Sequence, residues 1–289
     1  MRTDERPVVV GVDGSGPSLH AVDRAADEAA LRRVPLRVVY ASLWERYEGT
    51  ALAGDHKPDE EVRADDIVAV AARRARERRP ELTVSAEVVA EEPEYVLVRE
   101  GRDASALVLG TRGRGSVREM LLGSVSLTVA AHAHCPVIVV RGEGSGAGPH
   151  GPVVVGVGEH GKDAAAVRFA VAEARLRGVP LEAVRAWRRP ARESVDHPLL
   201  TGEPARRHEE RAAEALQEAL ADVPADVELR RRTVEGPPRD VLLDASRDAG
   251  LLVVGARRTH GHRGLQLGRV AHGVLHRADC AVAVVPEPE

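Results

Sequence analysis

Short apolar runs alternate with longer amphipathic segments along the first half of the chain. The run 7–12 is continuous and rich in β-branched residues, which is typical of a strand buried on both faces of a parallel sheet. Strands are also predicted over the short apolar runs 36–40, 106–110 and 136–140. A further strand is predicted over 82–89. Helical spacing of apolar residues predicts four helices: 18–33, 59–79, 93–103 and one from Ser124 towards Pro136. This alternation indicates an α/β fold, with a parallel sheet wrapped by helices.

The second of these helices is rich in alanine, arginine and glutamate. Its mixed charges are expected to form a solvated helix face over 59–79.

The second half of the chain repeats the pattern of the first at a constant shift. VVVGVDGS at 8–15 returns as VVVGVGEH at 153–160, and LVLGTRGR at 107–114 returns as LVVGARRT at 252–259. Both pairs are shifted by 145 residues, as the positions 8 and 153 show. A repeat one domain long indicates a tandem duplication rather than a solenoid.

The join between the two copies is rich in glycine, as a flexible linker should be. We therefore expect a first domain over 1–141, a linker over 142–152 and a second domain over 153–289.

The composition is that of an ordinary globular protein, with 43% hydrophobic and 30% charged residues. A formal net charge of −4 and an aromatic content of 2% argue against nucleic-acid partners, which need a basic surface or stacking platforms. No secretory signal is recognisable, and no apolar run approaches the roughly 20 residues that span a bilayer. We expect a cytoplasmic protein that has no membrane partner.

The loops after the first and fourth strands carry the residues best suited to a ligand. Ligands of open α/β sheets bind beyond the carboxyl ends of the strands, where the strand order reverses. If the first and fourth strands are neighbours, Asp13 and the glycine-rich loop 110–124 face one crevice. Glycine lets backbone N–H groups approach an anion, and a helix beginning near Ser124 offers unpaired N–H donors, so the crevice fits phosphate.

Two residues of this crevice have more than one interpretation. Ser124 can cap its helix or contact a phosphate oxygen. Asp13 can hold a ribose hydroxyl or, through water, a metal ion on the phosphates. Tight turns and helix capping alone would explain the same residues without a ligand.

The spacing Gly110-x2-Gly113-x9-Gly123-Ser124 resembles the ATP-binding signature of the universal stress protein family, G-x2-G-x9-G-[ST]. The resemblance extends to VVVGVDGS at 8–15, LLGSVS at 121–126 and HCPVIVV at 134–140, and it covers both halves. It implies two tandem domains of the adenine-nucleotide alpha-hydrolase-like type. Each would be a doubly wound five-stranded parallel sheet with the strand order 3-2-1-4-5.

By this resemblance, Asp13 would contact the ribose or adenine side of ATP, and the backbone around Ala41 would line the adenine pocket. Mg²⁺ could accompany the phosphates. The resemblance implies this set of nucleotide-binding residues: Gly11, Asp13, Ala41, Gly110, Thr111, Arg112, Gly113, Arg114, Gly115, Ser116, Gly123, Ser124, Val125 and Ser126. Arg112, Arg114 and Arg118 could add positive charge, although arginines on a loop are solvated by default.

The stretch GVGEHGKD at 156–163 formally matches two other phosphate motifs. It fits Gly-x-Gly-x2-Gly, the dinucleotide fingerprint, and Gly-x4-Gly-Lys, which is close to a P-loop. The strand that follows offers no acidic residue for a ribose, and Asp163 stands where a P-loop needs Ser or Thr for magnesium. We interpret the stretch as a plain strand-to-helix turn.

The other reactive side chains suggest no catalytic chemistry. Four histidines of the second half invite a metal site but are expected to be polar surface residues: His260, His262, His272 and His276. Cys135 and Cys280 stand at equivalent positions before the last strands and are expected to be small core residues. Neither Ser15 nor Ser124 has a recognisable histidine partner that would make it a nucleophile.

These observations predict an ATP-binding universal stress protein with a regulatory role in a stress response and with slow or no ATP hydrolysis. Two alternatives stay open. The chain could have lost nucleotide binding and act through protein contacts, or it could be an adenylyl-transfer type enzyme of related fold.

The second half is not expected to bind ATP in the family's manner. At the shift of 145 residues, three contacts are replaced: Asp13 by Gly158, Gly113 by Arg258 and Ser124 by Arg269. The last strand of each half is an edge in the expected order, and both are apolar. We therefore expect the two edges to pair in an intramolecular pseudo-dimer, with a homodimer as a further possibility.

Overall fold

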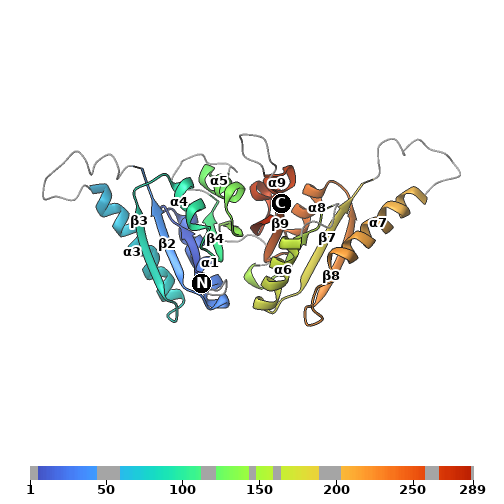
Figure 1. Ribbon diagram of the computed structural model, residues 1–289, viewed down its shortest axis with the longest axis horizontal. Coiled ribbons are helices and arrows are strands. Elements are labelled where there is room, and N and C mark those ends of the chain that lie inside the picture. The colour runs from blue at the N-terminus through green and yellow to red at the C-terminus, as the bar shows by residue number, and fades with distance from the viewer. Residues whose placement is uncertain are drawn as a thin grey trace. The chain divides into compact units, whose positions relative to one another are not determined.

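The computed structural model describes residues 6–43, 59–111, 122–142, 148–158, 164–188, 203–257 and 267–287. The chain folds as two compact units, with strands β1 to β5 in the first and β6 to β10 in the second (Figure 1). No helix in these ranges is long and apolar enough to cross a membrane. The α/β fold predicted from the sequence is confirmed.

The first unit alternates strands and helices throughout. Its strands are β1 (Val8–Gly11), β2 (Leu36–Ala41), β3 (Val84–Val89), β4 (Ala106–Gly110) and β5 (Val137–Val140). Its helices are α1 (Gly16–Arg32), α3 (Asp59–Arg78), α4 (Pro93–Glu100) and α5 (Ser124–His132).

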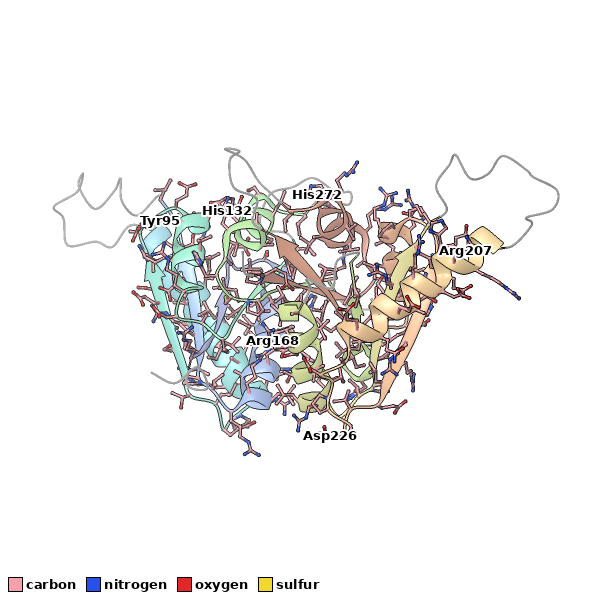
Figure 2. The ribbon with its side chains drawn as sticks, turned by 45° about the vertical axis from the view of Figure 1, so that its right-hand side comes forward. Tyr95, His132, Arg168, Arg207, Asp226 and His272 are labelled. Carbon is pink, nitrogen blue, oxygen red and sulfur yellow. The ribbon has the colours of Figure 1, made fainter. Side chains whose placement is uncertain are left out.

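The strands of the first unit are parallel and lie in the order β3-β2-β1-β4-β5. This is the order expected from the resemblance. The connections from β1 to β2 and from β2 to β3 run towards one edge of the sheet. The connections from β3 to β4 and from β4 to β5 run towards the other edge. Because such crossovers are right-handed, α1 and α3 cover one face of the sheet and α4 and α5 the other. The packing of α1 against α3 and of α4 against α5 agrees; Tyr95 marks α4 and His132 marks α5 in Figure 2.

The two central strands are the most deeply buried part of the unit. Val8 and Val10 of β1 and Leu107 and Val108 of β4 are fully buried. Helices cover both faces of these strands, which explains why the sequence shows continuous apolar runs instead of alternation.

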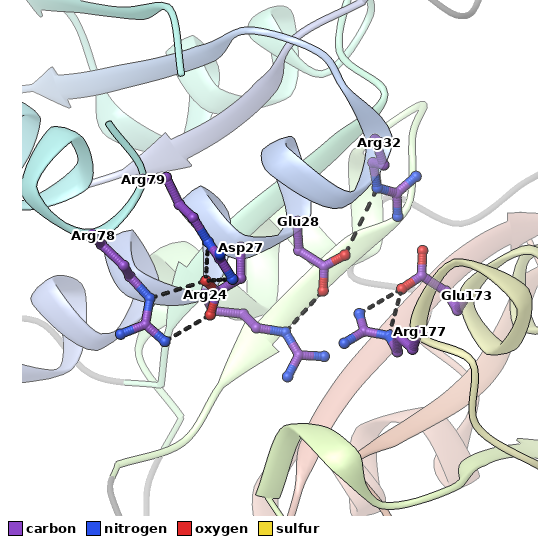
Figure 3. Close-up of polar contacts among 8 residues, drawn as sticks. All are labelled: Arg24, Asp27, Glu28, Arg32, Arg78, Arg79, Glu173 and Arg177. Atoms are coloured by element: carbon purple, nitrogen blue, oxygen red, sulfur yellow. Dashed lines mark hydrogen bonds and ion pairs between the residues drawn. The ribbon is translucent and has the colours of Figure 1, made fainter. Parts of the chain in front are cut away.

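Helix α3 is attached to α1 by ion pairs. Arg74 donates two hydrogen bonds to the carboxylate of Asp23, at 2.7 and 2.6 Å. Four residues further along both helices, Arg78 and Arg79 donate to Asp27 (Figure 3). The hydrogen bond to Asp27 raises the pKa of Arg78. The side chains of these arginines are 41–43% exposed, in agreement with the expected solvated face, and they also bind the neighbouring helix.

Each unit also buries one glutamate at an equivalent position of its first helix. Glu28 of α1 accepts a hydrogen bond from Arg24 at 2.8 Å, and Glu173 of α6 (Ala164–Arg177) accepts one from Arg177 at 2.6 Å (Figure 3). Both pairs join residues four apart on one helix face, so the helix itself supplies the partner that a buried charge needs.

The second unit repeats the first. Its strands are β6 (Val153–Gly156), β7 (Leu181–Trp187), β8 (Leu229–Glu235), β9 (Leu251–Arg257) and β10 (Ala281–Glu287). Its helices, besides α6, are α7 (Glu203–Ala219), α8 (Pro238–Ala245) and α9 (Arg269–Arg277). The strands are parallel in the order β8-β7-β6-β9-β10, which is the same as in the first unit.

The described end of the expected linker packs onto the second unit. Gly148–His150 form a short 3₁₀ helix, and a Cβ on Gly250 would lie 2.7 Å from the carbonyl oxygen of Gly148. The N–H of Gly250 donates to the carbonyl of Pro152 at 2.9 Å. Residues 148–152 can lie this close to Gly250 because residue 250 has no side chain.

Candidate functional site

The carboxyl ends of β1 and β4 lie side by side at one edge of the first sheet. β1 pairs with β2 on one side and with β4 on the other, so the strand order reverses between β1 and β4. This is the position at which open α/β sheets bind ligands. The crevice predicted from the sequence therefore has the required topology.

Asp13 is held in a defined turn between β1 and α1. The backbone N–H and the hydroxyl of Ser15 both donate to Oδ1 of Asp13, at 3.0 and 2.6 Å. Gly14 between them has a φ of 79°, which favours glycine. Ser15 is the N-cap of α1, and its Oγ accepts from the N–H of Ser18 at 3.3 Å. The turn thus fixes the Asp13 carboxylate at the edge of the crevice.

The first turn of α5 is bonded to the end of β4, the strand next to β1. The N-cap of α5 is Gly123, with φ −64° and ψ 148°, and no side chain caps the helix. Ser124 is therefore the first helical residue and not the cap, and its contact with a phosphate oxygen stays a prediction. Its exposed hydroxyl makes a long hydrogen bond of 3.5 Å to Glu94 of α4. A first turn without a side-chain cap presents N–H donors to an anion.

Ser126 has a different role from Ser124. It is buried, and its hydroxyl donates to the carbonyl of Gly110 at 2.7 Å. The N–H of Gly123 donates to the carbonyl of Thr111 at 2.8 Å, and the N–H of Thr111 donates to Val140 at 3.1 Å. These bonds attach the start of α5 to the ends of β4 and β5. The hydroxyl of Ser126 is thus used inside the unit, and a contact of this residue with a ligand stays a prediction.

Two of the candidate glycines lie close to other parts of the unit, Gly11 to leucine side chains and Gly110 to rigid backbone. A Cβ on Gly11 would lie 2.7 Å from Cδ2 of Leu109 and 3.1 Å from the methyl groups of Leu97. A Cβ on Gly110 would lie 2.7 Å from the carbonyl oxygen of Pro17 in the first turn of α1. Packing alone explains both glycines, so their direct contact with a ligand stays a prediction.

Ala41 lies at the end of β2, next to the end of β1. The N–H groups of Leu36 and Ser42 donate towards β3, to Thr83 and Val89. Because backbone polar groups alternate along a strand, those of Ala41 face the β1 side, beyond the last residue of β1. The position fits the adenine-lining role that the resemblance implies.

The remaining candidates divide into two groups. Val125 lies in the first turn of α5 and is partly exposed. The others lie outside the described residues: Arg112, Gly113, Arg114, Gly115, Ser116 and Arg118.

One arginine on α4 is already paired within the unit. Nη1 of Arg99 lies 2.9 Å from both carboxylate oxygens of Glu91, and its guanidinium carbon lies 5.4 Å from the ring centroid of Tyr95. The hydrogen bond with Glu91 raises the pKa of Arg99. The Arg99 guanidinium is therefore bound by Glu91, which follows β3, and by Tyr95 of α4.

The family model of the universal stress proteins matches the chain twice, over residues 5–141 and 150–286. The chain belongs to the universal stress protein family. Universal stress protein Rv2005c of Mycobacterium tuberculosis is 35% identical over 290 residues, which cover 96% of each chain. Rv2623 of the same species is 32% identical over 303 residues, 97% of this chain and 96% of the relative. The crystal structure of a universal stress protein from Archaeoglobus fulgidus shares the fold, with a TM-score of 0.68 at 17% identity over the full length of both chains.

The second domain of this universal stress protein has a different crevice. Gly158 stands at the position of Asp13, and its carbonyl accepts a hydrogen bond from Nη1 of Arg185. Arg185 is the counterpart of Tyr40, since 185 − 145 = 40. A guanidinium therefore occupies the β6–β7 side of the second crevice, a feature that comparison of the motifs alone missed.

The start of α9 is the counterpart of the start of α5. Gly268 is its N-cap and no side chain caps it, but Arg269 replaces Ser124 as the first helical residue. A Cβ on Gly156 would lie 2.8 Å from Cδ1 of Leu242, so the counterpart of Gly11 serves the same packing. Arg258 and residues 159–163, with most of the near P-loop stretch, lie outside the described residues.

The cysteines lie in the core. Cys135 and Cys280 are both buried, and burial raises the pKa of the Cys135 thiol to about 12. The expectation of small core residues is confirmed. His272 and His276 stack with ring centroids 4.5 Å apart, whereas His260 and His262 lie outside the described residues.

Proposed function

We propose that the first domain binds ATP, and that the protein is a cytoplasmic regulator of a stress response. The proposal is carried by two features that follow neighbouring strands at the point of strand-order reversal: the Asp13 turn after β1, and the start of α5, which is bonded to the end of β4 and has no side-chain cap. A nucleotide presents a ribose and phosphates, which suit a fixed carboxylate on one side and N–H donors on the other. The signature from Gly110 to Ser124 supports the same site.

Each group in this proposal has one task. The carboxylate of Asp13, held by Ser15, would hold a ribose hydroxyl or a hydrated Mg²⁺. The backbone of Ala41 would line the adenine. Ser124 and the N–H groups of the first turn of α5 would hold the phosphates. Gly110 would act indirectly, by allowing β4 to end against α1.

We further propose one ATP per chain. The second domain has Gly158 in place of the carboxylate and Arg269 in place of the serine, so it lacks both partners. The guanidinium of Arg185 also lies where the first domain has Tyr40.

The test is ATP titration by calorimetry on the full-length protein, together with mass spectrometry of any ligand released on denaturation. Asp13→Asn keeps an oxygen that can accept from Ser15 but removes the charge. We expect it to weaken ATP binding at least tenfold, or about 1.4 kcal/mol, without loss of stability. Gly113→Leu is expected to have a similar effect.

Asp103→Asn is the matched control, because it removes an exposed carboxylate at the opposite edge of the same sheet. Wild-type affinity in both Asp13→Asn and Gly113→Leu would remove the site. A wild-type protein without measurable ATP affinity would favour a stress protein that acts through protein contacts. ATP-dependent release of pyrophosphate with a co-substrate would favour an adenylyl-transfer enzyme.

A further inference from the structure

A cavity of about 280 Å³ opens beside the carboxyl end of β7 in the second domain. It lies between the end of that strand and the first half of α7. Figure 2 shows Arg207 on this part of α7, far from Asp226 at the other edge of the domain. The polar side chains that line the cavity are those of Arg185, Arg188, His208 and Arg211. Trp187 completes the wall, and none of the described lining residues is acidic.

Arg185 is the deepest of these side chains. It is only 7% exposed, and Nη1 donates to the carbonyl of Gly158. Its Nε is buried and has no hydrogen-bond partner in the described part of the chain. A buried guanidinium with an unmet N–H donor is costly, so an anion in the cavity would supply what the domain itself does not.

Arg188 and Arg211 lie at the exposed mouth of the cavity. Neither forms an ion pair with another described residue, although arginines elsewhere in the domain do. Arg232, for example, donates to Glu182 at 3.0 Å. Within the described part of the chain, the mouth therefore carries two positive charges that no acidic side chain offsets.

A second cavity in the same domain shows the contrast. It has a volume of about 400 Å³ and lies at the amino edge of the sheet. Its arginine, Arg175, is paired with Asp226 at 2.9 Å, and Glu228 also lines it. Acidic side chains thus offset the positive charge in that cavity, whereas none of the described residues that line the cavity beside β7 does so.

We propose that the cavity beside β7 binds a pyrophosphate group, carried by inorganic pyrophosphate or by the tail of a nucleoside diphosphate. Guanidinium groups bind phosphate oxygens bidentately, and three of them match the roughly three negative charges of two linked phosphates near pH 7. The site shares no residue with the ATP site proposed for the first domain and does not depend on it.

The chain offers a built-in reporter, because it has two tryptophans and one of them, Trp187, lines the cavity. Trp44→Phe leaves Trp187 as the only tryptophan of the full-length protein. Titration of this variant with inorganic pyrophosphate is expected to change its fluorescence saturably, with a Kd below about 1 mM that weakens as salt is added.

Arg188→Gln and Arg211→Gln in the same background are each expected to weaken pyrophosphate binding at least tenfold. Both side chains are exposed, so the variants should fold, which circular dichroism checks. Arg231→Gln is the matched control: it removes an exposed arginine of β8 outside the cavity and should shift the Kd less than twofold. Asp13→Asn should leave pyrophosphate binding unchanged, which separates this site from the first domain.

ADP distinguishes the two sources of the group. If ADP binds with a Kd at least tenfold lower than that of inorganic pyrophosphate, the site is assigned to a nucleotide tail. If ADP binds equally well or more weakly, the site is assigned to the free anion. The proposal is overturned if Trp187 fluorescence shows no saturable change. It is also overturned if the folded Arg188→Gln and Arg211→Gln variants bind like Arg231→Gln.

Discussion

Gly110 joins the packing of the first domain to its candidate site. Its missing side chain allows β4 to end against the backbone of Pro17, and its carbonyl accepts the hydroxyl of Ser126 from α5. The position of the first turn of α5 therefore depends on a close approach between β4 and α1. A residue assigned to phosphate binding by its motif acts here through packing.

Gly110→Ala is expected to destabilise the first domain by about 1–3 kcal/mol, because the new Cβ would meet rigid backbone atoms 2.7 and 2.8 Å away. Gly16→Ala is the matched control, since its Cβ would have no neighbour within 4 Å. Its effect should stay within about 0.5 kcal/mol. Urea unfolding of the full-length variants measures both. If Gly110→Ala and Gly16→Ala lower the free energy of unfolding equally, the packing argument is wrong.

Cys135 predicts a pH dependence of stability. Burial raises the pKa of its thiol to about 12 from an ordinary value of 9.0. Above pH 9 the unfolded chain loses a proton that the folded chain keeps, so the free energy of unfolding falls as pH rises towards 12. The slope from this group is at most about 1.4 kcal/mol per pH unit.

The measurement compares wild type with Cys135→Ala by urea unfolding between pH 8 and pH 10.5. The decline should be shallower in the variant, while Cys280 is present in both proteins. Identical slopes would show that the thiol of Cys135 ionises as readily in the folded chain as in the unfolded one.

At the level of elements, the first helices of the two domains begin with different caps. Ser15 caps α1 from the preceding turn. At the start of α6, the N–H groups of Ala165 and Ala166 donate to the carboxylate of Glu287, at 3.1 and 2.8 Å. Glu287 is the last residue of β10 and is buried. One domain thus uses a local cap, and the other uses the far end of its own sheet.

Glu287→Gln should destabilise the second domain by about 0.5–2 kcal/mol, because a carboxylate interacts with the positive end of a helix better than an amide does. Hydrogen exchange at Ala165 and Ala166 should become faster. Glu209→Gln, which removes an exposed carboxylate on α7, should change neither quantity. Unchanged exchange at both alanines in Glu287→Gln would mean that the charge of the cap adds nothing.

Apolar periodicity was sufficient for the order and type of the elements, but less so for their ends. The helix expected over 93–103 stops at Glu100, because the N–H groups of Arg102 and Asp103 donate to carbonyls three residues back instead of four. The helix expected to continue towards Pro136 stops at His132, since Ala133 is already extended, with ψ 151°. Both ends are set by backbone geometry that a periodicity does not encode.

In the candidate site, too, the sequence predicted local features but not contacts between distant residues. The glycine spacing correctly located the start of α5, because a helix N-terminus has a local signature. It could not reveal that Ser126 turns inward to Gly110, or that Arg185 reaches the carbonyl of Gly158. These bonds join residues 16 and 27 positions apart, and only the folded sheet brings them together.

At the scale of the whole molecule, the duplication has left one fold with two different carboxyl edges. The first domain keeps the carboxylate of Asp13 and the serine at the start of α5. The second replaces them with glycine and arginine and gathers arginines beside β7. The two proposed sites therefore differ in chemistry: one suits a whole nucleotide, the other a compact anion.

Each domain also has one apolar edge strand, β5 in the first and β10 in the second. Leu107 and Thr111 of β4 donate to the carbonyls of Pro136 and Val140 in β5. Since these groups alternate, the N–H of Val139 points away from β4. Val284 is its counterpart in β10, since 139 + 145 = 284. Bare apolar edges promote aggregation, so we expect the two edges to cover each other.

Proline at both Val139 and Val284 removes an outward N–H donor from each edge but leaves the bonds to β4 and β9 in place. The double variant should therefore be less compact than wild type, with a larger radius of gyration in X-ray scattering and faster proteolysis within 142–152. The matched control places threonine at both positions, which keeps the N–H and the β-branched shape and should behave like wild type. A proline double variant as compact and as protease-resistant as wild type would show that these edges do not hold the two domains together.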